Sequence, residues 1–252
     1  MATFKKQYGQ HFLRDSRYLH CIFNAANLTP ESSVFEIGGG DGFLTRAILG
    51  FDIKRLWVFE IDEEWATELK KIQDDRLTVF LDNILDVDFS RFEKDKPWTL
   101  LANLPYNITF PILHMLQKNR HFLNEGVIMI QEEVAQKILA THGRGYGYVA
   151  LFFQRYFDWK LLDKVPPAAF YPPPKVFSRL LYFKPKVDIV AIPQEEKFWK
   201  FIKVCFKQPR RTLSNNLRGT QYLEYFNEET RALRAQQLNM QDLLDLWSKI
   251  IA

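Results

Sequence analysis

The sequence is poor in the residues that build covalent cross-links and metal sites. Among its 252 residues there are two cysteines, Cys21 and Cys205, and five histidines. Two cysteines cannot form a disulfide framework, and the spacing of the histidines matches no metal-binding pattern. The composition therefore argues against a disulfide-rich domain and a zinc module, and we expect no metal cofactor.

Long apolar runs are also missing. No stretch approaches the roughly 20 apolar residues that a membrane-spanning helix requires. The opening segment, MATFKKQYGQHFL, contains two lysines but no apolar run long enough for a signal peptide. We therefore expect no membrane association and a cytoplasmic location. We also expect a monomer.

Charge is unevenly distributed along the chain. The net charge is +4, yet residues 31–96 hold 16 acidic and 9 basic side chains. By contrast, residues 196–218 hold seven basic side chains and one acidic side chain, and the first 17 residues hold four and one. This asymmetry is typical of a protein with a polyanionic partner. Solvated basic faces give the same pattern, and charge alone favours neither interpretation.

Short apolar segments recur at nearly equal intervals in the first half of the chain. Four of them end at Gly38, Glu60, Asp82 and Asn103, in steps of 22, 22 and 21 residues. Each lacks amphipathic alternation, which is typical of strands buried on both faces of a parallel sheet. Residues 61–72 carry an apolar stripe at helical spacing, so the repeat unit is a strand followed by a helix.

The second half of the chain adds strands and then changes character. Residues 125–131 predict a fifth strand, followed by a helix. Residues 149–162 and 178–185 predict an antiparallel pair of strands joined through a proline-rich segment. The pattern favours an α/β fold: an open, mostly parallel, doubly wound, Rossmann-like sheet over residues 1–186. Two apolar stripes at helical spacing predict a small α-helical domain over residues 187–252.

The first strand end carries a glycine loop, EIGGGDGF, with glycines at 38, 39, 40 and 42. In open α/β sheets, ligands bind beyond the carboxyl ends of the strands. A dinucleotide fingerprint reads G-x-G-x-x-G, but counting from Gly38 its third glycine position holds Phe43. The spacing therefore argues against a nicotinamide oxidoreductase. A glycine loop packed against a smaller, zwitterionic ligand fits better.

Acidic residues end the second and third strands. Glu60 is placed to accept both hydroxyls of a ribose. Asp82 is placed to accept from an adenine amine, although it would also suit the N-cap of a helix. An adenosine bound without phosphates indicates S-adenosylmethionine, with S-adenosylhomocysteine as product. We include the following residues, Ile61 and Asn83, in the predicted cofactor site, with Gly38 and Gly40 from the loop.

The fourth strand end, ANLPY, carries the predicted transfer chemistry. An exocyclic adenine amine is a poor nucleophile, and two acceptors aimed at its hydrogens would localise its lone pair. Asn103 offers a side-chain oxygen, and the backbone carbonyl of Leu104 offers a second acceptor because Pro105 restrains it. Tyr106 offers a ring for a flipped-out base. The alternative is a plain turn with a core tyrosine.

In these motifs the chain resembles the small-subunit ribosomal RNA adenine N6,N6-dimethyltransferases, which are class I methyltransferases. The resemblance rests on KKQYGQHFL (5–13), EIGGGDG (36–42), NLPY (103–106), PPAAFYPPPKVFS (166–178) and FKQPRRTLSNNL (206–217). It implies dimethylation of two adjacent adenines in a hairpin near the 3′ end of small-subunit rRNA, and a role in ribosome biogenesis.

The resemblance also assigns residues. His11 and Leu13 match family positions that contact the cofactor, and Asn103 joins them. Phe170 matches an aromatic residue that sandwiches the target adenine against Tyr106, although a phenylalanine before three prolines would also suit loop packing. We expect RNA contacts from basic residues near both ends of the chain, namely Lys5, Lys6, Arg14, Lys200, Lys203, Lys207, Arg210 and Arg211.

Two other functions stay open on the sequence. A large-subunit rRNA adenine methylase of the macrolide-resistance type shares the glycine loop and an N-x-P-Y motif. A catalytically silent methylase-like assembly or transcription factor would share the fold. The NLPY, PPPKV and QPRRTL segments favour the small-subunit enzyme. The sequence leaves open whether free RNA or an assembling subunit is the substrate.

Overall fold

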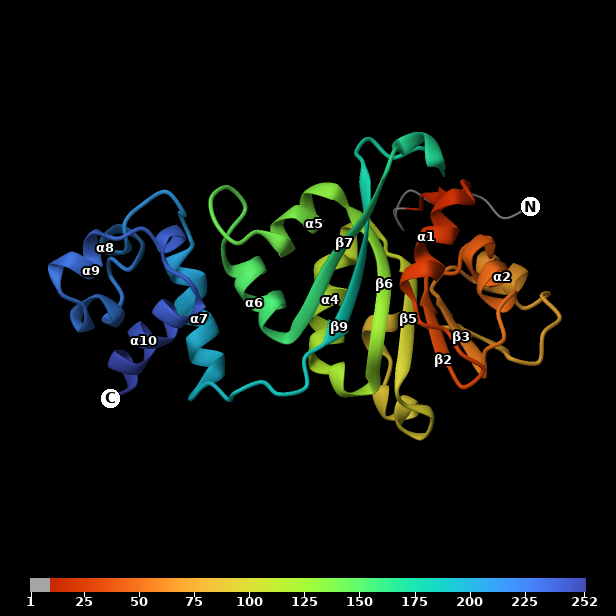
Figure 1. Cartoon of the computed structure of the whole chain (residues 1–252), viewed down its shortest axis with the longest axis horizontal. Coiled ribbons are helices and arrows are strands. Elements are labelled where there is room, and N and C mark those ends of the chain that lie inside the picture. The colour runs from red at the N-terminus through yellow and green to blue at the C-terminus, as the bar shows by residue number, and fades with distance from the viewer. Residues whose placement is uncertain (1–9) are drawn as a thin grey trace. The chain divides into compact units, whose positions relative to one another are not determined.

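The computed structural model describes residues 10–252, which divide into two compact units (Figure 1). Within the described residues, the first unit comprises residues 10–135 and 157–185, and the second comprises residues 136–156 and 186–252. The strands, all in the first unit, are β1 (Phe12–Leu13), β2 (Ser33–Ile37), β3 (Arg55–Glu60), β4 (Leu77–Leu81), β5 (Trp98–Asn103), β6 (Leu123–Gln131), β7 (Phe157–Val165), β8 (Phe170–Tyr171) and β9 (Ser178–Pro185). The α-helices along the chain are α1 (Arg17–Ala25), α2 (Phe43–Leu49), α3 (Glu63–Leu69), α4 (Thr109–Lys118), α5 (Glu132–Leu139), α6 (Tyr148–Tyr156), α7 (Glu195–Cys205), α8 (Leu213–Asn216), α9 (Glu228–Ala232) and α10 (Met240–Ile251).

Seven strands form one mixed sheet in the order β4-β3-β2-β5-β6-β9-β7. The first five run parallel, and β9 pairs antiparallel with both β6 and β7. This confirms the predicted doubly wound sheet and the antiparallel strand pair at its edge. The predicted strand ends also hold, because β2 and β4 stop one residue before Gly38 and Asp82, and β3 and β5 end at Glu60 and Asn103.

The two faces of the sheet differ because side chains alternate along each strand. One face presents aliphatic residues such as Val34 and Val58 to a core that includes Ile22, Leu44 and Leu69 of α1, α2 and α3. The other face is aromatic. The rings of Phe35, Trp57, Phe59, Phe80 and Trp98 lie on the strands, and Phe92 of the turn Phe89–Asp95 packs among them, with centroid distances of 4.5–6.3 Å. Much of the abundant phenylalanine therefore serves core packing.

The prediction of a strand over residues 149–162 is wrong in its first half. Residues 148–156 form helix α6, and strand β7 begins at Phe157. The run VALFF is apolar because Ala150, Leu151 and Phe153 are all buried, so the helix shows no polar face over this stretch. A short buried helix and a buried strand give the same apolar run, and β-branched and aromatic residues favoured the strand.

The second unit is helical and holds its own core. Phe198, Phe201, Ile202 and Cys205 form the buried stripe of α7, as the sequence predicted, and the Trp247 ring of α10 packs against the first two. The unit differs from the predicted domain, residues 187–252, because residues 136–156 belong to it as well. Hydrogen bonds explain the difference. The Tyr156 hydroxyl donates to Glu195 at 2.6 Å and accepts from Trp199 at 3.0 Å, which joins α6 to α7.

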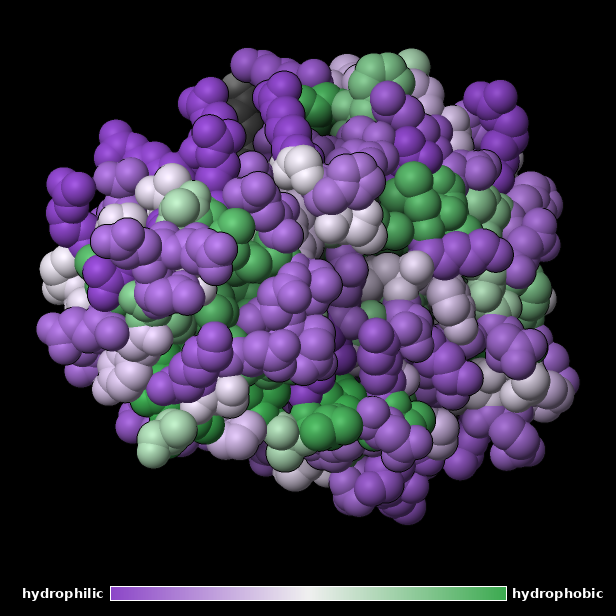
Figure 2. All heavy atoms as spheres, turned by 60° about the vertical axis from the view of Figure 1, so that its left-hand side comes forward, coloured by the Kyte–Doolittle hydropathy of each residue, from purple (hydrophilic) through white to green (hydrophobic). Residues whose placement is uncertain are grey.

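Hydrophilic side chains dominate the face of the molecule in Figure 2, where hydrophobic atoms appear as separate patches. Within residues 10–252, none of the helices combines the length and the apolar character that crossing a bilayer would require.

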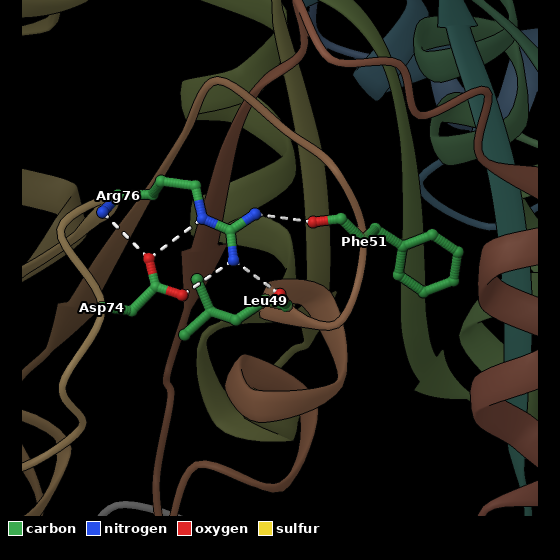
Figure 3. A network of polar contacts seen from close by, with 4 residues as sticks. All are labelled: Leu49, Phe51, Asp74 and Arg76. Carbon is green, nitrogen blue, oxygen red and sulfur yellow. Dashed lines mark hydrogen bonds and ion pairs between the residues drawn. The ribbon is translucent and has the colours of Figure 1, made fainter.

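A guanidinium-centred network fixes the edge of the sheet near β4. The Arg76 side chain donates to the carbonyls of Leu49 and Phe51, each at 2.7 Å, and to both carboxylate oxygens of Asp74 (Figure 3). Leu49 ends α2, and Phe51 lies two residues further along the chain. The Arg76 side chain therefore joins the end of that helix to the turn before β4. Only a planar donor fork satisfies all these acceptors at once.

We expect Arg76→Ala to lower the free energy of unfolding by about 1–3 kcal/mol, because it leaves two backbone carbonyls without their donor. Arg76→Lys should recover less than half of the loss, since one ammonium cannot reach the whole set. Lys71→Ala is a matched control, because Lys71 pairs with Glu68 at the surface with 63% of its side chain exposed. Urea unfolding of the three variants measures the difference. Equal losses in Arg76→Ala and Lys71→Ala would contradict the role of the network.

Candidate functional site

A pocket lies at the carboxyl ends of the parallel strands. Four strand ends contribute to it, with Gly38 after β2, Glu60 in β3, Asp82 after β4 and Asn103 in β5. Its other walls are largely apolar. The remaining lining residues are Gln10, His11, Phe12, Ile37, Gly40, Phe59, Ile61, Asn83, Ile84, Leu104, Pro105, Tyr106 and Ile108. A mostly apolar cavity with a few convergent polar groups is the usual form of a small-molecule site.

The glycine loop forms the floor of this pocket. Gly38 has φ +75°, and no atom lies within 4 Å of where its Cβ would stand, so a side chain there would project into open space. Gly40 has φ +52°, and an added Cβ would lie 2.1 Å from the ring of Phe12. Both positions require glycine, the first for backbone conformation and the second also for the packed ring.

Glu60 is buried and bound to the backbone around it. Its carboxylate accepts from the N–H of Gly40 and of Asp62, each at 2.9 Å. Burial raises the pKa of Glu60, and these hydrogen bonds oppose the rise. The side chain thus holds the glycine loop against β3 and also lines the pocket. Its carboxylate oxygens keep further lone pairs with which a ligand hydroxyl could bond.

The sequence left two roles open for Asp82, an acceptor for adenine and the N-cap of a helix, and the N-cap role belongs to Asn83. Asn83 is the N-cap of the turn Ile84–Asp86, accepting from the N–H of Leu85 at 3.2 Å. Asp82 instead pairs with Arg91 at 3.3 Å with 44% of its side chain exposed. Arg91 lies over the Phe80 ring, 4.4 Å from its centroid. Both predicted residues line the pocket.

Asn103 is oriented by the segment near the amino terminus. Its amide nitrogen donates to the carbonyl of His11 at 2.8 Å. A carbonyl can only accept, so this contact fixes which end of the amide is nitrogen. The amide oxygen consequently points away from His11. Leu104, which follows, is held by its N–H bond to the carbonyl of Met129 at 3.0 Å.

Tyr106 is supported on two sides. Its ring stacks on the His11 imidazole with centroids 5.6 Å apart and planes inclined by 29°. Its hydroxyl lies at hydrogen-bond distance from Ser178 at the start of β9. Burial raises the pKa of this phenol, with the Ser178 bond opposing, so the ring stays neutral over the ordinary pH range. A neutral, clamped ring in a pocket is suited to stack with a flat ligand.

Two predicted residues lie outside this pocket. Leu13 is 5% exposed and lines a smaller hollow behind the glycine loop. Phe170 is 4% exposed and pairs with Leu13 between β8 and β1. In this structure Phe170 belongs to the hydrophobic core, so it presents no free face to the ring of Tyr106.

The predicted basic residues are mostly exposed. Lys200, Lys203 and Lys207 lie along α7 and just after it, and Arg210 and Arg211 follow them. Lys203 lies over the Tyr148 ring, 4.7 Å from its centroid. Arg14, in the other unit, forms an ion pair with Asp41. Lys5 and Lys6 lie outside the described residues.

Sequence reasoning missed several lining residues, above all Gln10 and Phe12. They reach the pocket because the amino-terminal segment crosses the strand ends, where Gln10 donates to Asp62 at 3.1 Å. No local pattern signals such a crossing. Ile84 could have been found, since it directly follows the strand-end pair Asp82-Asn83.

The comparisons with known proteins decide the family. The family model described as ribosomal RNA adenine dimethylase matches residues 1–251. The chain belongs to the ribosomal RNA adenine dimethylase family. Curated relatives named ribosomal RNA small subunit methyltransferase A include one from Syntrophotalea carbinolica, 39% identical over 85% of this chain and 82% of the relative. Another, from Thermotoga maritima, is 36% identical over 97% of this chain and 85% of the relative.

Solved structures show the same fold. A dimethyladenosine transferase from Plasmodium falciparum matches with a TM-score of 0.81 and 22% identity, covering 96% of this chain and 98% of that chain. The 23S rRNA methyltransferase ErmE matches with a TM-score of 0.72 and 21% identity, covering 96% and 100%. The sheet and its helices therefore have the fold of these two structures.

Burial of Glu36 makes the free energy of unfolding depend on pH. It is 1% exposed, accepts from the Thr45 hydroxyl at 2.6 Å, and burial raises its pKa from 4.5 to about 8. The folded state therefore favours the protonated form. Its stabilising contribution is fully present below pH 4.5 and is lost as the pH rises through 8, with a slope of at most about 1.4 kcal/mol per pH unit.

We expect Glu36→Gln to flatten the decline in unfolding free energy between pH 5 and pH 9 (about 2–4 kcal/mol over this range), because glutamine keeps the acceptor but does not ionise. Urea unfolding at several pH values, without cofactor, measures it. Glu63→Gln, at an exposed carboxyl, should keep the wild-type slope. An unchanged slope in Glu36→Gln would assign the pH dependence to another group.

Proposed function

We propose that this chain is an S-adenosylmethionine-dependent methyltransferase that dimethylates N6 of two adjacent adenines in the 3′-terminal hairpin of small-subunit rRNA. One observation carries the proposal: four strand ends converge on one pocket, and the last of them holds an oriented amide beside a clamped tyrosine ring. Family membership and the names of the relatives support the same activity.

The lining of the pocket supports S-adenosylmethionine as the cofactor. The open space above Gly38 lets a ligand approach the backbone, as a small zwitterion on a glycine loop would require. Glu60 would hold the ribose, and the apolar side chains of Ile61 and Ile84 would contact the adenine beside Asp82. When bound, the cofactor supplies a methyl group made electrophilic by its sulfonium. The described site residues do the rest by binding and orientation.

Asn103 and Leu104 would prepare the target amine. The Asn103 oxygen and the Leu104 carbonyl each accept one hydrogen of the exocyclic amine, which pulls its lone pair out of conjugation with the ring. Tyr106 would hold the flipped base by stacking. No strong base is needed, because the methylated ammonium loses its proton readily to water. Catalysis of this kind rests on positioning, and that accounts for the clamped side chains.

The small subunit is the favoured substrate over the large one. The two relatives with 36% and 39% identity carry the small-subunit name. The 23S rRNA methyltransferase ErmE is 21% identical, and at that identity the similarity shows the fold alone. A silent assembly factor is disfavoured because the Asn103–Tyr106 set lies together in the pocket.

The proposal is tested with radiolabelled S-adenosylmethionine and either unmethylated small subunits or large-subunit RNA. Label is expected on the small-subunit RNA alone, with two methyl groups on each of two adenines. Label on large-subunit RNA would overturn the assignment, and no label on either would favour the silent binding protein.

We expect Asn103→Ala to lower the methyl-transfer rate by about 10²–10³ while most cofactor affinity remains, because one oriented acceptor is lost. Asn103→Asp should transfer faster than Asn103→Ala, since it keeps an acceptor oxygen while losing the donor to His11. Rates come from single-turnover transfer and cofactor affinity from calorimetry. Undiminished turnover in Asn103→Ala would show that the amine is activated elsewhere.

We expect RNA affinity to fall steeply with salt, with each phosphate contact contributing about −0.7 to −0.9 to the log–log slope. Replacing Lys200, Lys203 and Lys207 together by alanine should reduce that slope by about 2–3. A control triple of exposed lysines in the acidic segment, Lys70, Lys71 and Lys94, removes the same charge. A flat salt response, or equal losses in both triples, would count against RNA contacts from Lys200, Lys203 and Lys207.

A further inference from the structure

The connection between β8 and β9 exposes large apolar side chains at one place. We call residues 171–177 the proline loop, which lies within the connection from β7 to β9 in Figure 1. Tyr171 is 57% exposed, Val176 43% and Phe177 45%. Three successive prolines at 172–174 restrict the backbone of the loop, so less backbone freedom is lost when a ligand binds there.

The proline loop is joined to the site at both of its ends. The Nδ1–H of His11 donates to the carbonyl of Pro172 at 2.8 Å, since a carbonyl can only accept. At the other end, Ser178 directly follows Phe177 and contacts the Tyr106 hydroxyl. His11 and Tyr106 both line the pocket. If one base of an RNA strand enters the pocket, a neighbouring nucleotide of that strand would therefore contact the proline loop.

The charges around the loop select the kind of partner. Lys164 holds its ammonium 4.4 Å from the centroid of the Phe177 ring, and Lys175 is exposed on the loop itself. Single exposed apolar side chains are common and need no function. Aromatic rings interleaved with lysines are different, because unpaired nucleotides bind by stacking bases on rings while cations hold the phosphates.

We infer that the proline loop binds an unpaired nucleotide adjoining the target adenine, with its base stacked on Phe177 and its phosphate beside Lys164 and Lys175. The inference rests on the proposed function for the identity of the RNA. It assigns Phe177 as a residue that positions the substrate, whereas the reacting base lies with Asn103 and Tyr106.

The test compares Phe177→Ala, Phe177→Trp and Phe51→Ala. Phe51 is a matched control, because it is 39% exposed and precedes β3, at the opposite ends of the parallel strands from the pocket. Equilibrium binding is measured with a hairpin RNA that carries two adjacent adenines in its loop, and with unmethylated small subunits. Phe177→Ala should bind both about 5- to 100-fold more weakly, the range of one lost base stack. Phe177→Trp and Phe51→Ala should bind within about 3-fold of the wild type. Cofactor affinity should stay unchanged in all three.

A second RNA set identifies the contact. Hairpins with an abasic site on the 5′ or the 3′ side of the adenines should weaken wild-type binding at one of the two positions. At that position, the abasic site should cause no further loss of affinity in the Phe177→Ala variant. Wild-type affinity in Phe177→Ala, or a loss that the abasic sites do not share, would overturn the inference. A defect seen with small subunits but not with the hairpin would assign the loop to a ribosomal protein and overturn it as well.

The inference and the proposed function fail separately. If the wild type methylates small-subunit RNA but Phe177→Ala binds as tightly as the wild type, only the inference fails. If Phe177→Ala weakens binding as described but the wild type transfers no methyl group, only the enzymatic proposal fails.

Discussion

The site depends on one hydrogen bond between residues far apart in the chain. The Asn103 amide donates to the carbonyl of His11 at 2.8 Å, across 92 positions. This bond turns the amide so that its oxygen points away from the amino-terminal segment. It also joins that segment to the end of β5, close to where Phe12 packs on Gly40. The orientation of the acceptor therefore depends on the amino-terminal segment, which also lines the pocket.

The strand-end residues could be predicted because their signal is local and repeated. Gly38, Glu60, Asp82 and Asn103 follow short apolar runs at steps of 22, 22 and 21 residues, and parallel strands bring their carboxyl ends to one edge. Periodicity therefore gave the fold class and these four lining residues. It could not give the amino-terminal segment, whose position depends on pairing Phe12 with Tyr171, a contact between distant parts of the chain.

The errors have equally physical causes. The apolar run at residues 149–153 is compatible with a helix or a strand when all its sides are buried, and only the packing of α6 against α7 decides between them. That packing also places residues 136–156 in the second unit, which no linker composition signalled. A boundary predicted from a single change of pattern along the sequence finds one passage of the chain between the units and misses the others.

The two phenylalanines on either side of the prolines differ in solvent exposure. Phe170 is 4% exposed in the core, and Phe177 is 45% exposed beside a lysine. Bringing a buried phenylalanine into contact with a base would cost about 1.5–3 kcal/mol of lost burial. The sandwich that the family resemblance implies for Phe170 therefore requires binding free energy from elsewhere in the RNA. A nucleotide stacked on Phe177 needs no such rearrangement and adds binding free energy at the same loop.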